Sequence, residues 1–196
     1  MKTKQETVRA LQTLAGEGLL DIQTVRAALP DTDPTLYRCA DAWEMIHHHF
    51  GPAARECHFA YGPCGTGKTH WARCLLTRCK HRGWEVAEMR AREFLRLASQ
   101  YGRQDSRVRF VERTADLVLI DDVDKADYRS RDYVEALLEL VDVRTGRGLI
   151  FTSNLNAREL LAMLVQARDG NTTHTAAFQD RLATWQVWQF AGASLR

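Results

Sequence analysis

The sequence predicts an α/β protein with a five-stranded parallel sheet and helices on both faces. Short apolar runs alternate with longer helical patterns from residue 56 onward. The most apolar run, LVLI at residues 117–120, contains no polar residue, as a strand buried on both faces requires. A glycine-rich stretch, GPCGTGKT at residues 62–69, joins the first run to the first helical pattern. Strands connected by helical crossovers pair in parallel, so these observations favour one sheet that is covered on both sides.

Strands and helices are expected to alternate along residues 57–190. The expected strands are CHFAYG (57–62), WEVAEM (84–89), DLVLIDDV (116–123), LIFTSN (149–154) and TWQVWQF (184–190). The expected helices are KTHWARCLLTRCKHRG (68–83), AREFLRLASQYG (91–102), SRDYVEALLELVDVRTGRG (130–148) and NARELLAMLVQAR (156–168). Gly83 is expected to end the first helix, because glycine accepts the left-handed conformation that often follows a helix. The stretch DGNTTHT (169–175) is expected to be a flexible loop.

Residues 1–50 differ from the core that is expected over residues 51–196. Two short amphipathic patterns within residues 6–30 are interrupted by Gly16 and Gly18. We interpret them as a short N-terminal helical extension that binds a partner, as amphipathic helices dock into grooves. The alternative is that these helices only pack on the core.

The composition excludes both a membrane protein and a disordered one. Of the 196 residues, 45% are hydrophobic and 27% are charged, which is typical of a globular domain. No window approaches the roughly 18 apolar residues of a membrane span, and the first residues, MKTKQETVRALQ, lack the apolar run of a secretory signal. The five cysteines include no C-x-x-C pair, so neither a disulfide framework nor a zinc site is indicated. We therefore expect a cytoplasmic protein with no membrane partner.

Basic residues concentrate in residues 73–113, which we call the arginine-rich segment. The segment holds eleven basic residues, ten of them arginine, against five acidic ones, an excess of six. The whole chain carries a net charge of only +2, so acidic residues elsewhere offset this excess. Such clustering suits a phosphate-rich partner. The alternative is a pair of helices whose charged faces are only solvated.

Residues 62–69 have the spacing G-x-x-x-x-G-K-T, which predicts a loop that holds a nucleoside triphosphate. The position of this loop between a strand and a helix supports the prediction. Glycines let backbone N–H groups turn inward around an anion, and the helix N-terminus adds its dipole. Lys68 is expected to reach the β and γ phosphates, and the Thr69 hydroxyl to bind Mg²⁺. The residues expected to contact the nucleotide are Gly62, Pro63, Cys64, Gly65, Thr66, Gly67, Lys68, Thr69 and His70.

Polar residues at the ends of two later strands complete the expected site. In LVLIDDVD, Asp121 is expected to bind Mg²⁺ through water, and Asp122 is expected to polarise the attacking water. The alternative for both is that they cap the next helix. Asn154, which ends the run LIFTSN, is expected to contact the γ-phosphate and orient water, although such a residue can also be only a turn residue.

Taken together, GPCGTGKTHWA, LVLIDDV and IFTSNLNARELL resemble the AAA+ ATPases, in particular the DnaC-type helicase loaders and the related IstB-type transposition ATPases. The resemblance covers about residues 51–196. It implies a P-loop NTPase core in which the strand before the loop neighbours the sensor strand, which neighbours the strand of Asp121. It also implies ATP hydrolysis with ATP and Mg²⁺, stimulated by a partner or by DNA, and no separate lid domain. The family often has Asp-Glu where this chain has Asp-Asp, so a slow rate is expected.

Further roles follow from the resemblance alone. FQDRLATW resembles the segment that holds the arginine finger, which assigns that role to Arg181 and implies a self-oligomer. The ending GASLR resembles the family's ending with a second sensor, which makes Arg196 a nucleotide contact. In the family the region between the second and third strands reaches single-stranded DNA, and here that region belongs to the arginine-rich segment.

The preferred interpretation is a DNA replication helicase loader-like ATPase that binds single-stranded DNA and acts as an oligomeric switch on a replicative helicase. An IstB-type transposition helper uses the same machinery, and the sequence separates the two poorly. A P-loop nucleotide or small-molecule kinase shares the loop but needs an acceptor site and an arginine-rich lid, neither of which the sequence suggests. A nucleotide-binding adaptor without turnover is a third alternative, in which Asp122→Asn would be silent.

Overall fold

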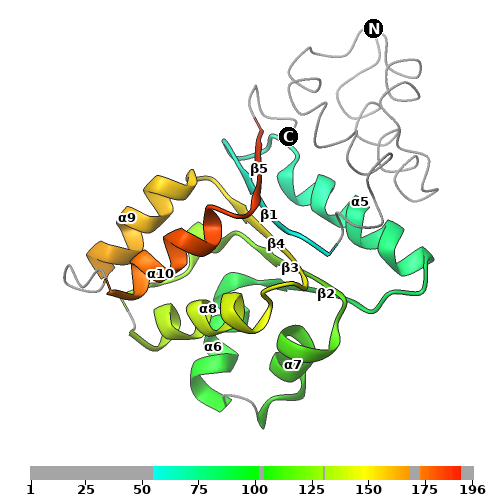
Figure 1. Ribbon diagram of the computed structural model, residues 1–196, viewed down its shortest axis with the longest axis horizontal. Helices are drawn as coiled ribbons and strands as arrows, with labels where there is room; N and C mark the ends of the chain where they lie inside the picture. The colour runs from blue at the N-terminus through cyan, green and yellow to red at the C-terminus, as the bar shows by residue number, and fades with distance from the viewer. Residues whose placement is uncertain (1–54, 102–103, 130, 168–172, 191–196) are drawn as a thin grey trace, which may run out of the picture.

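Figure 1 shows the computed structural model of the chain. It describes residues 55–101, 104–129, 131–167 and 173–190. The expected N-terminal extension, the boundary at residue 51 and Arg196 lie outside the described residues, and these expectations stay predictions.

The core is a five-stranded sheet whose neighbouring strands all pair in parallel. The strands are β1 (Cys57–Tyr61), β2 (Val86–Arg90), β3 (Leu117–Asp121), β4 (Gly148–Ser153) and β5 (Gln186–Gln189). Their order across the sheet is β2-β3-β4-β1-β5. β1, which precedes the glycine loop, therefore neighbours β4, and β4 neighbours β3, as the resemblance implied. Because the strands are parallel, their carboxyl ends meet at one edge of the sheet.

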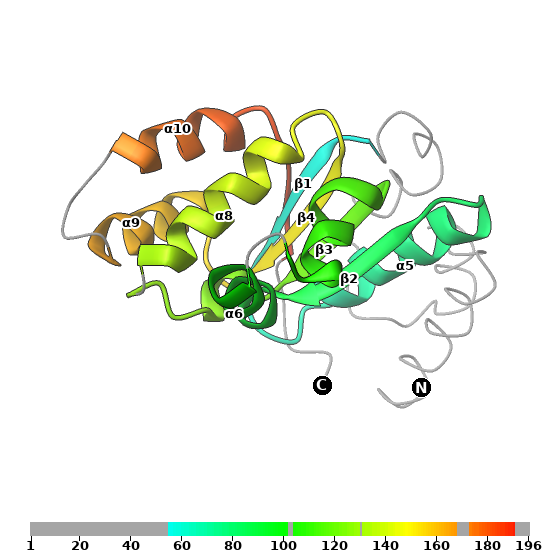
Figure 2. The same ribbon diagram turned by 90° about the horizontal axis from the view of Figure 1, so that it is seen from below.

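Helices cover both faces of this sheet (Figures 1 and 2). The α-helices are α5 (Lys68–His81), α6 (Ala91–Tyr101), α7 (Ser106–Arg109), α8 (Arg131–Val143), α9 (Ala157–Ala167) and α10 (Thr173–Leu182). A π-helical turn, η3 (Phe110–Thr114), precedes β3, and a 3₁₀ turn, η4 (Val123–Lys125), follows it. α5 lies on one face of the sheet, and α6, α8, α9 and α10 lie on the other (Figure 2). The predicted fold class is thereby confirmed.

α5 forms as the sequence predicted. It begins after Gly67 and buries Trp71, Leu75 and Leu76 against the sheet. These side chains recur at helical spacing, so one stripe of the helix faces the core. The helix ends before Gly83, whose φ of 82° is the left-handed conformation that favours glycine at this position.

The prediction of a flexible loop over residues 169–175 is wrong for its last three residues, because α10 begins at Thr173. The core contacts of this helix come from Phe178 and Leu182, which are buried one turn apart. Two apolar positions in a short polar stretch give a weak periodic signal, so burial against the neighbouring helices decides the conformation.

The sheet separates two packed layers. Phe59 and Phe151 belong to the larger core under α6, α8, α9 and α10, where Trp185 packs on Phe151 with ring centroids 5.0 Å apart. On the α5 side, Trp188 Nε1 donates to His58 Nδ1 at 3.2 Å. No described helix combines the length and hydropathy that crossing a bilayer requires.

Candidate nucleotide site

The glycine loop connects the end of β1 to the first turn of α5, at the carboxyl edge of the sheet. Gly65 and Gly67 have φ values of 84° and 96°, in the left-handed region that glycine adopts readily. Gly62, at φ 145°, donates its N–H to the Ser153 carbonyl at 3.2 Å. A Cβ at Gly62 would lie 1.8 Å from the Phe190 carbonyl oxygen. Only glycine fits there, so β4 and the end of β5 fix the start of the loop.

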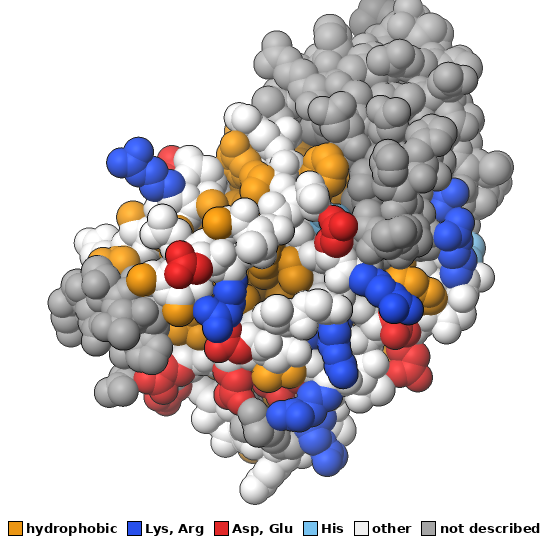
Figure 3. Space-filling view, in the orientation of Figure 1, with side chains coloured by type: hydrophobic (Ala, Val, Ile, Leu, Met, Phe, Trp, Pro, Cys, Tyr) orange, Lys and Arg blue, Asp and Glu red, His pale blue; other side chains and the backbone are white. Residues whose placement is uncertain are grey.

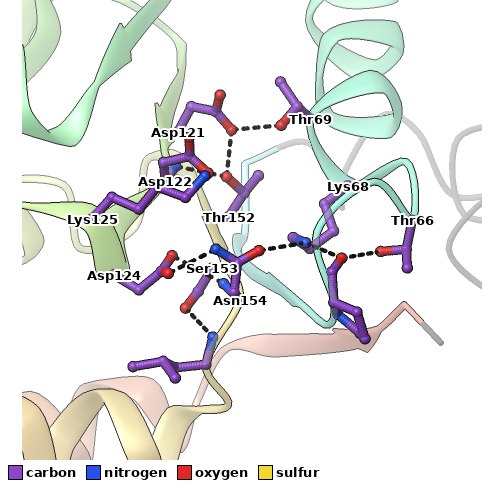
Figure 4. Close-up of polar contacts among 12 residues, drawn as sticks. Thr66, Lys68, Thr69, Asp121, Asp122, Asp124, Lys125, Thr152, Ser153 and Asn154 are labelled. Carbon is purple, nitrogen blue, oxygen red and sulfur yellow. Dashed lines mark hydrogen bonds and ion pairs between the residues drawn. The ribbon is translucent and has the colours of Figure 1, made fainter. Parts of the chain in front are cut away.

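The Lys68 side chain points back toward the glycine loop, and only 6% of the residue's surface is exposed (Figure 4). Its Nζ donates to the carbonyl oxygens of Gly62 at 2.6 Å and Pro63 at 2.8 Å. It also donates to Asn154 Oδ1 at 3.3 Å. Burial lowers the pKa of Lys68, because the charged ammonium is removed from water. An ammonium has three N–H donors, and these three oxygens accept all of them. A phosphate oxygen that binds Lys68 would therefore replace one of these acceptors, at a helix N-terminus that favours an anion.

Asp121 is held between α5 and β4 (Figure 4). Thr69 Oγ1 donates to Asp121 Oδ1 at 2.8 Å, and Thr152 Oγ1 donates to the same oxygen. Because both hydroxyls use Oδ1, Oδ2 is the oxygen that can face a metal ion or its water. The fold therefore brings together Thr69 and Asp121, the two residues that the sequence assigned to Mg²⁺.

Asp122 leaves β3 in the left-handed conformation, with φ 58° and ψ 50°. No other non-glycine residue in the described part of the chain has a positive φ. Its backbone N–H donates to Thr152 Oγ1 at 2.9 Å, and its Oδ1 accepts from Lys125 Nζ at 2.8 Å. This hydrogen bond raises the pKa of Lys125. The Asp122 side chain is 32% exposed, so water can reach its carboxylate.

Asn154 follows β4 and is held from two sides (Figure 4). Its backbone N–H donates to Asp124 Oδ1 at 2.9 Å, and its Nδ2 donates to Asp124 Oδ2 at 2.8 Å. Its Oδ1 accepts from Lys68 at 3.3 Å. The amide that the sequence assigned to the γ-phosphate therefore lies beside the loop lysine.

This set of side chains fits a nucleotide with Mg²⁺. Mg²⁺ prefers oxygen ligands and keeps several waters or phosphate oxygens. Thr69 and Asp121 would supply such oxygens, and Lys68 would supply positive charge to the phosphates. Among the residues that the structure describes, no three His, Cys, Asp or Glu side chains gather into a metal site. An ion held here would therefore take its other ligands from phosphate and water.

The other predicted nucleotide contacts lie on the same loop and the same turn of α5. Pro63 and Cys64 are exposed, whereas Thr66 is buried and donates its hydroxyl to the Pro63 carbonyl at 2.9 Å. His70 is partly buried, and its Nε2 lies 3.7 Å from Cys74 Sγ. Burial lowers the pKa of His70. Thr66 and His70 thus have packing roles besides the predicted contact.

Arg181 lies in α10 and contacts its own chain. Its Nε forms an ion pair with Asp142 of α8, and its Nη1 donates to the Ala177 carbonyl at 2.9 Å. Its side chain is 37% exposed. These contacts join α10 to α8 and not to the glycine loop, so the arginine-finger role stays a prediction about a neighbouring chain.

Three side chains of this site were not predicted from the sequence: Thr152, Asp124 and Lys125. A signal was available for Thr152, because it is a polar residue in the otherwise apolar run LIFT. Asp124 and Lys125 carry no such signal, because their contacts depend on the left-handed turn at Asp122 that begins η4. Spacing along the chain does not predict where that turn directs them.

The strand order, the glycine loop and the lysine, aspartate and asparagine around it define a P-loop NTPase with an AAA+ core. Residues 55–196 match the family described as IstB-like ATP binding protein. Because the match covers most of the chain, this protein belongs to that family. A search of curated protein sequences gave no significant match.

Several solved structures are similar to this chain in fold. DnaI is 15% identical with a TM-score of 0.61, over 85% of this chain and 86% of that one. The DnaC helicase loader is 16% identical with a TM-score of 0.61, over 82% of this chain and 92% of that one. The replication initiator DnaA bound to AMPPCP and single-stranded DNA is 19% identical with a TM-score of 0.58, over 78% of this chain. This chain spans only 46% of that DnaA chain.

Proposed function

We propose that this chain is a DNA replication helicase loader-like ATPase that binds single-stranded DNA and acts as a switch on a partner helicase. The observation that carries the proposal is the meeting of Lys68, Asn154 and the Thr69–Asp121 pair at one edge of the sheet. Membership of an ATP-binding family supports the choice of nucleotide. The similarity in fold to DnaI and to the DnaC helicase loader supports the choice of process.

Each side chain of the site has a part in the proposed hydrolysis. Lys68 would bind the phosphates, and Thr69 with Asp121 would hold Mg²⁺, which when bound neutralises phosphate charge. Asp122, whose carboxylate water can reach, would accept a proton from the attacking water. Asn154 would orient that water through its amide.

The contacts of Asp122 support a slow basal rate. Lys125 donates to Asp122 Oδ1 at 2.8 Å, so an ammonium competes with water for that carboxylate. A carboxylate oxygen that already accepts from an ammonium is less available to accept a hydrogen bond from the attacking water. Movement of the Lys125 side chain away from Asp122 on binding DNA or a partner would remove this competition and raise the rate.

Single-stranded DNA is the proposed partner of the arginine-rich segment, which the fold spreads from α5 to η3. Some of its arginines are used within the chain: Arg73 pairs with Glu88, and Arg107 pairs with Asp105. On the face shown in Figure 3, Lys and Arg side chains are interspersed with Asp and Glu. We therefore assign the DNA contact to a part of the segment and not to all of it.

The start of α6 is the best candidate for that part. Arg92 and Arg96 are exposed one turn apart on this helix, so they share one side of it. Arg90, also exposed, ends β2 and pairs in register with Asp121 on β3. A nucleic acid bound here would lie at the same sheet edge as the nucleotide, where the two can influence each other.

Charge-neutral variants test this assignment. The double variant R92Q/R96Q is expected to bind oligo(dT) more weakly and with less dependence on salt. Removing one phosphate contact lowers the slope of log K against log salt by about 0.7 for a single strand. R129Q is the matched control, because Arg129 is 88% exposed, lies outside the segment and pairs with its neighbour Asp127. An unchanged affinity and slope in the double variant would show that these arginines are only solvated.

A self-oligomer is proposed through Arg181, which would complete the site of an adjacent subunit. The variants K68A and R181A are each expected to be inactive alone. Mixed together they are expected to regain part of the activity, because an intact loop then meets an intact arginine. D142N, which removes the ion-pair partner of Arg181 on α8 and leaves Arg181 in place, is the control and is expected to stay active. Absence of any recovery in the mixture would remove Arg181 from this role.

An IstB-type transposition helper is the second candidate, and the family match is the observation that favours it. The two candidates differ in the protein on which they act. A helicase loader is expected to retain a purified replicative hexameric helicase in the presence of ATP. A transposition helper is expected instead to stimulate strand transfer by a transposase. The kinase alternative would require a phosphoryl acceptor that changes the rate of ATP consumption.

The direct test is steady-state ATP hydrolysis with and without single-stranded DNA, with K68A as the blank. We expect the wild-type chain to hydrolyse ATP slowly and its rate to change when DNA is added. K68A is expected to show no hydrolysis. Hydrolysis that DNA does not alter at any salt concentration would contradict the DNA-coupled function.

A further inference from the structure

We propose that Asp124 is the positioning residue that sets the orientation of the Asn154 amide. This inference rests on the proposed ATPase function, in which Asn154 orients the attacking water. Asp124 accepts both donors that Asn154 presents to it, the backbone N–H at 2.9 Å and Nδ2 at 2.8 Å (Figure 4). The carboxylate thus accepts hydrogen bonds from the backbone and from the side chain of the same residue.

The chemistry of the two neighbours permits only one orientation of the amide. A carboxylate accepts hydrogen bonds and an ammonium only donates them. Nδ2 of Asn154 therefore faces Asp124, and Oδ1 faces Lys68, 3.3 Å from its Nζ. The opposite orientation would place an NH₂ group against an ammonium and a carbonyl oxygen against a carboxylate. Without Asp124, Lys68 alone would bias the amide, and its rotation would be far less restricted.

The turn that carries Asp124 is itself anchored. The Val123 side chain is fully buried, and its carbonyl accepts a hydrogen bond from the Tyr128 hydroxyl at 2.7 Å. Tyr128 is only 3% exposed. Lys125, on the same turn, pairs with Asp122. Two consecutive side chains of η4 therefore contact the proposed catalytic groups. Asp124 holds the Asn154 amide that would orient water, and Lys125 contacts the Asp122 carboxylate that would accept the proton.

Asp124→Asn tests the proposal, because it keeps the size of the side chain and replaces one acceptor oxygen by an NH₂ group. One of the two donors of Asn154, the backbone N–H or Nδ2, then meets a donor where it met an acceptor. A loss of alignment of this kind can cost up to about 100-fold in rate, and we expect a decrease in kcat of about 10- to 100-fold. KM for ATP is expected to change less than about threefold, because Lys68 and the loop remain intact.

A double-mutant cycle separates positioning from a merely structural role. If Asp124 acts through Asn154, D124N has no further effect on kcat in an N154A background. D127N is the matched control, because Asp127 follows the same turn, is exposed and, among the residues that the structure describes, bonds only to Arg129. A wild-type kcat in D124N, or an equal decrease in both backgrounds, would overturn the proposal.

A second measurement does not depend on turnover. Hydrogen exchange of the Asn154 backbone amide is expected to quicken by at least about tenfold in D124A, which lacks the acceptor at 2.9 Å. If the wild-type chain does not exceed K68A in ATP hydrolysis, the proposed function fails, and this exchange rate alone decides the positioning role. Unchanged exchange in D124A would overturn that role, whatever the outcome of the ATPase assay.

Discussion

Thr69 and Asp121, 52 residues apart in the sequence, are joined by a hydrogen bond of 2.8 Å from the hydroxyl to the carboxylate. This bond connects the first turn of α5 to the end of β3. It places a hydroxyl and a carboxylate side by side, the two kinds of oxygen that a magnesium nucleotide site needs.

Asp121→Asn removes the negative charge and keeps the size of the side chain. We expect ATP turnover to fall at least about 100-fold, because a catalytic metal supplies several kcal/mol of stabilisation. The measurement is the rate as a function of Mg²⁺ concentration. D116N is the control, because Asp116 lies at the other end of β3 and bonds to the Glu85 N–H. A D121N variant with wild-type magnesium dependence would refute the metal assignment.

Thr152→Val replaces a hydroxyl by a methyl group at a fully buried position. The hydroxyl donates to Asp121 and accepts from the Asp122 N–H, so its loss removes the acceptor of that N–H and one of the two hydroxyls that donate to Asp121 Oδ1. A buried group without its hydrogen bond costs about 1–3 kcal/mol of unfolding free energy, which urea denaturation measures. T145V is the control, because Thr145 is exposed and its hydroxyl bonds to the Val141 carbonyl of its own helix end. Equal stability of the two variants would argue against this role for Thr152.

Gly62→Ala is expected to prevent correct assembly of the loop. Its Cβ would lie 1.8 Å from a backbone oxygen of Phe190, which cannot move without displacing the end of β5. Gly83→Ala is the comparison, because Gly83 has φ 82° but no heavy atom within 4 Å of the added Cβ. G83A should cost only the left-handed strain of about 1–2 kcal/mol. G62A should cost clearly more, and thermal unfolding of the pair would show whether it does.

The pH dependence of stability is expected to depend on His70. Burial lowers the pKa of this ring in the folded chain. In the unfolded chain the ring takes up a proton near pH 6.5. The contribution of His70 to the free energy of unfolding is therefore complete above that pH and decreases as the pH falls toward the lowered pKa. Urea unfolding at pH 7.5 and 5.5 should show a smaller loss in H70Q than in wild type.

The control for this comparison is H81Q, because His81 is exposed at the end of α5. H81Q should show the same loss of stability between pH 7.5 and pH 5.5 as wild type. The same pH sensitivity in H70Q and in wild type would mean that other groups account for it.

Lys125→Met removes the ammonium that competes for Asp122 and keeps most of the side-chain stem. We expect the rate of ATP hydrolysis without DNA to rise, by up to about fivefold, because an exposed ion pair is worth at most about 1 kcal/mol. K80M, at an exposed lysine in the last turn of α5, is the control. A lower rate in K125M would mean that Lys125 assists the reaction and does not restrain it.

Much of this fold was predictable because its signals are local. LVLI at β3 is apolar without interruption, and α5 shows both its buried stripe and its terminal Gly83. The glycine loop has a fixed spacing, so Lys68 and Thr69 could be placed on it. Asp121 and Asn154 could be assigned to the same site because the carboxyl ends of parallel strands share an edge.

The remainder depends on contacts between distant segments. The Phe190 carbonyl requires glycine at position 62, and no pattern near Gly62 indicates this contact. The hydrogen bonds between Asp124 and Asn154 depend on the left-handed conformation of Asp122. This conformation is uncommon outside glycine and cannot be predicted from residue spacing. α10 depends on two buried side chains and was partly taken for a loop.

The nucleotide site is tested most directly by the affinity for a non-hydrolysable ATP analogue with Mg²⁺, measured by calorimetry on wild type, K68M and K80M. Lys68 is the cation that the loop encloses, and charged hydrogen bonds of this kind are worth about 1.5–3 kcal/mol each. We predict binding by wild type and K80M, and a loss of at least about tenfold in K68M. Equal affinity of K68M and wild type would contradict the claim that this loop is the nucleotide site.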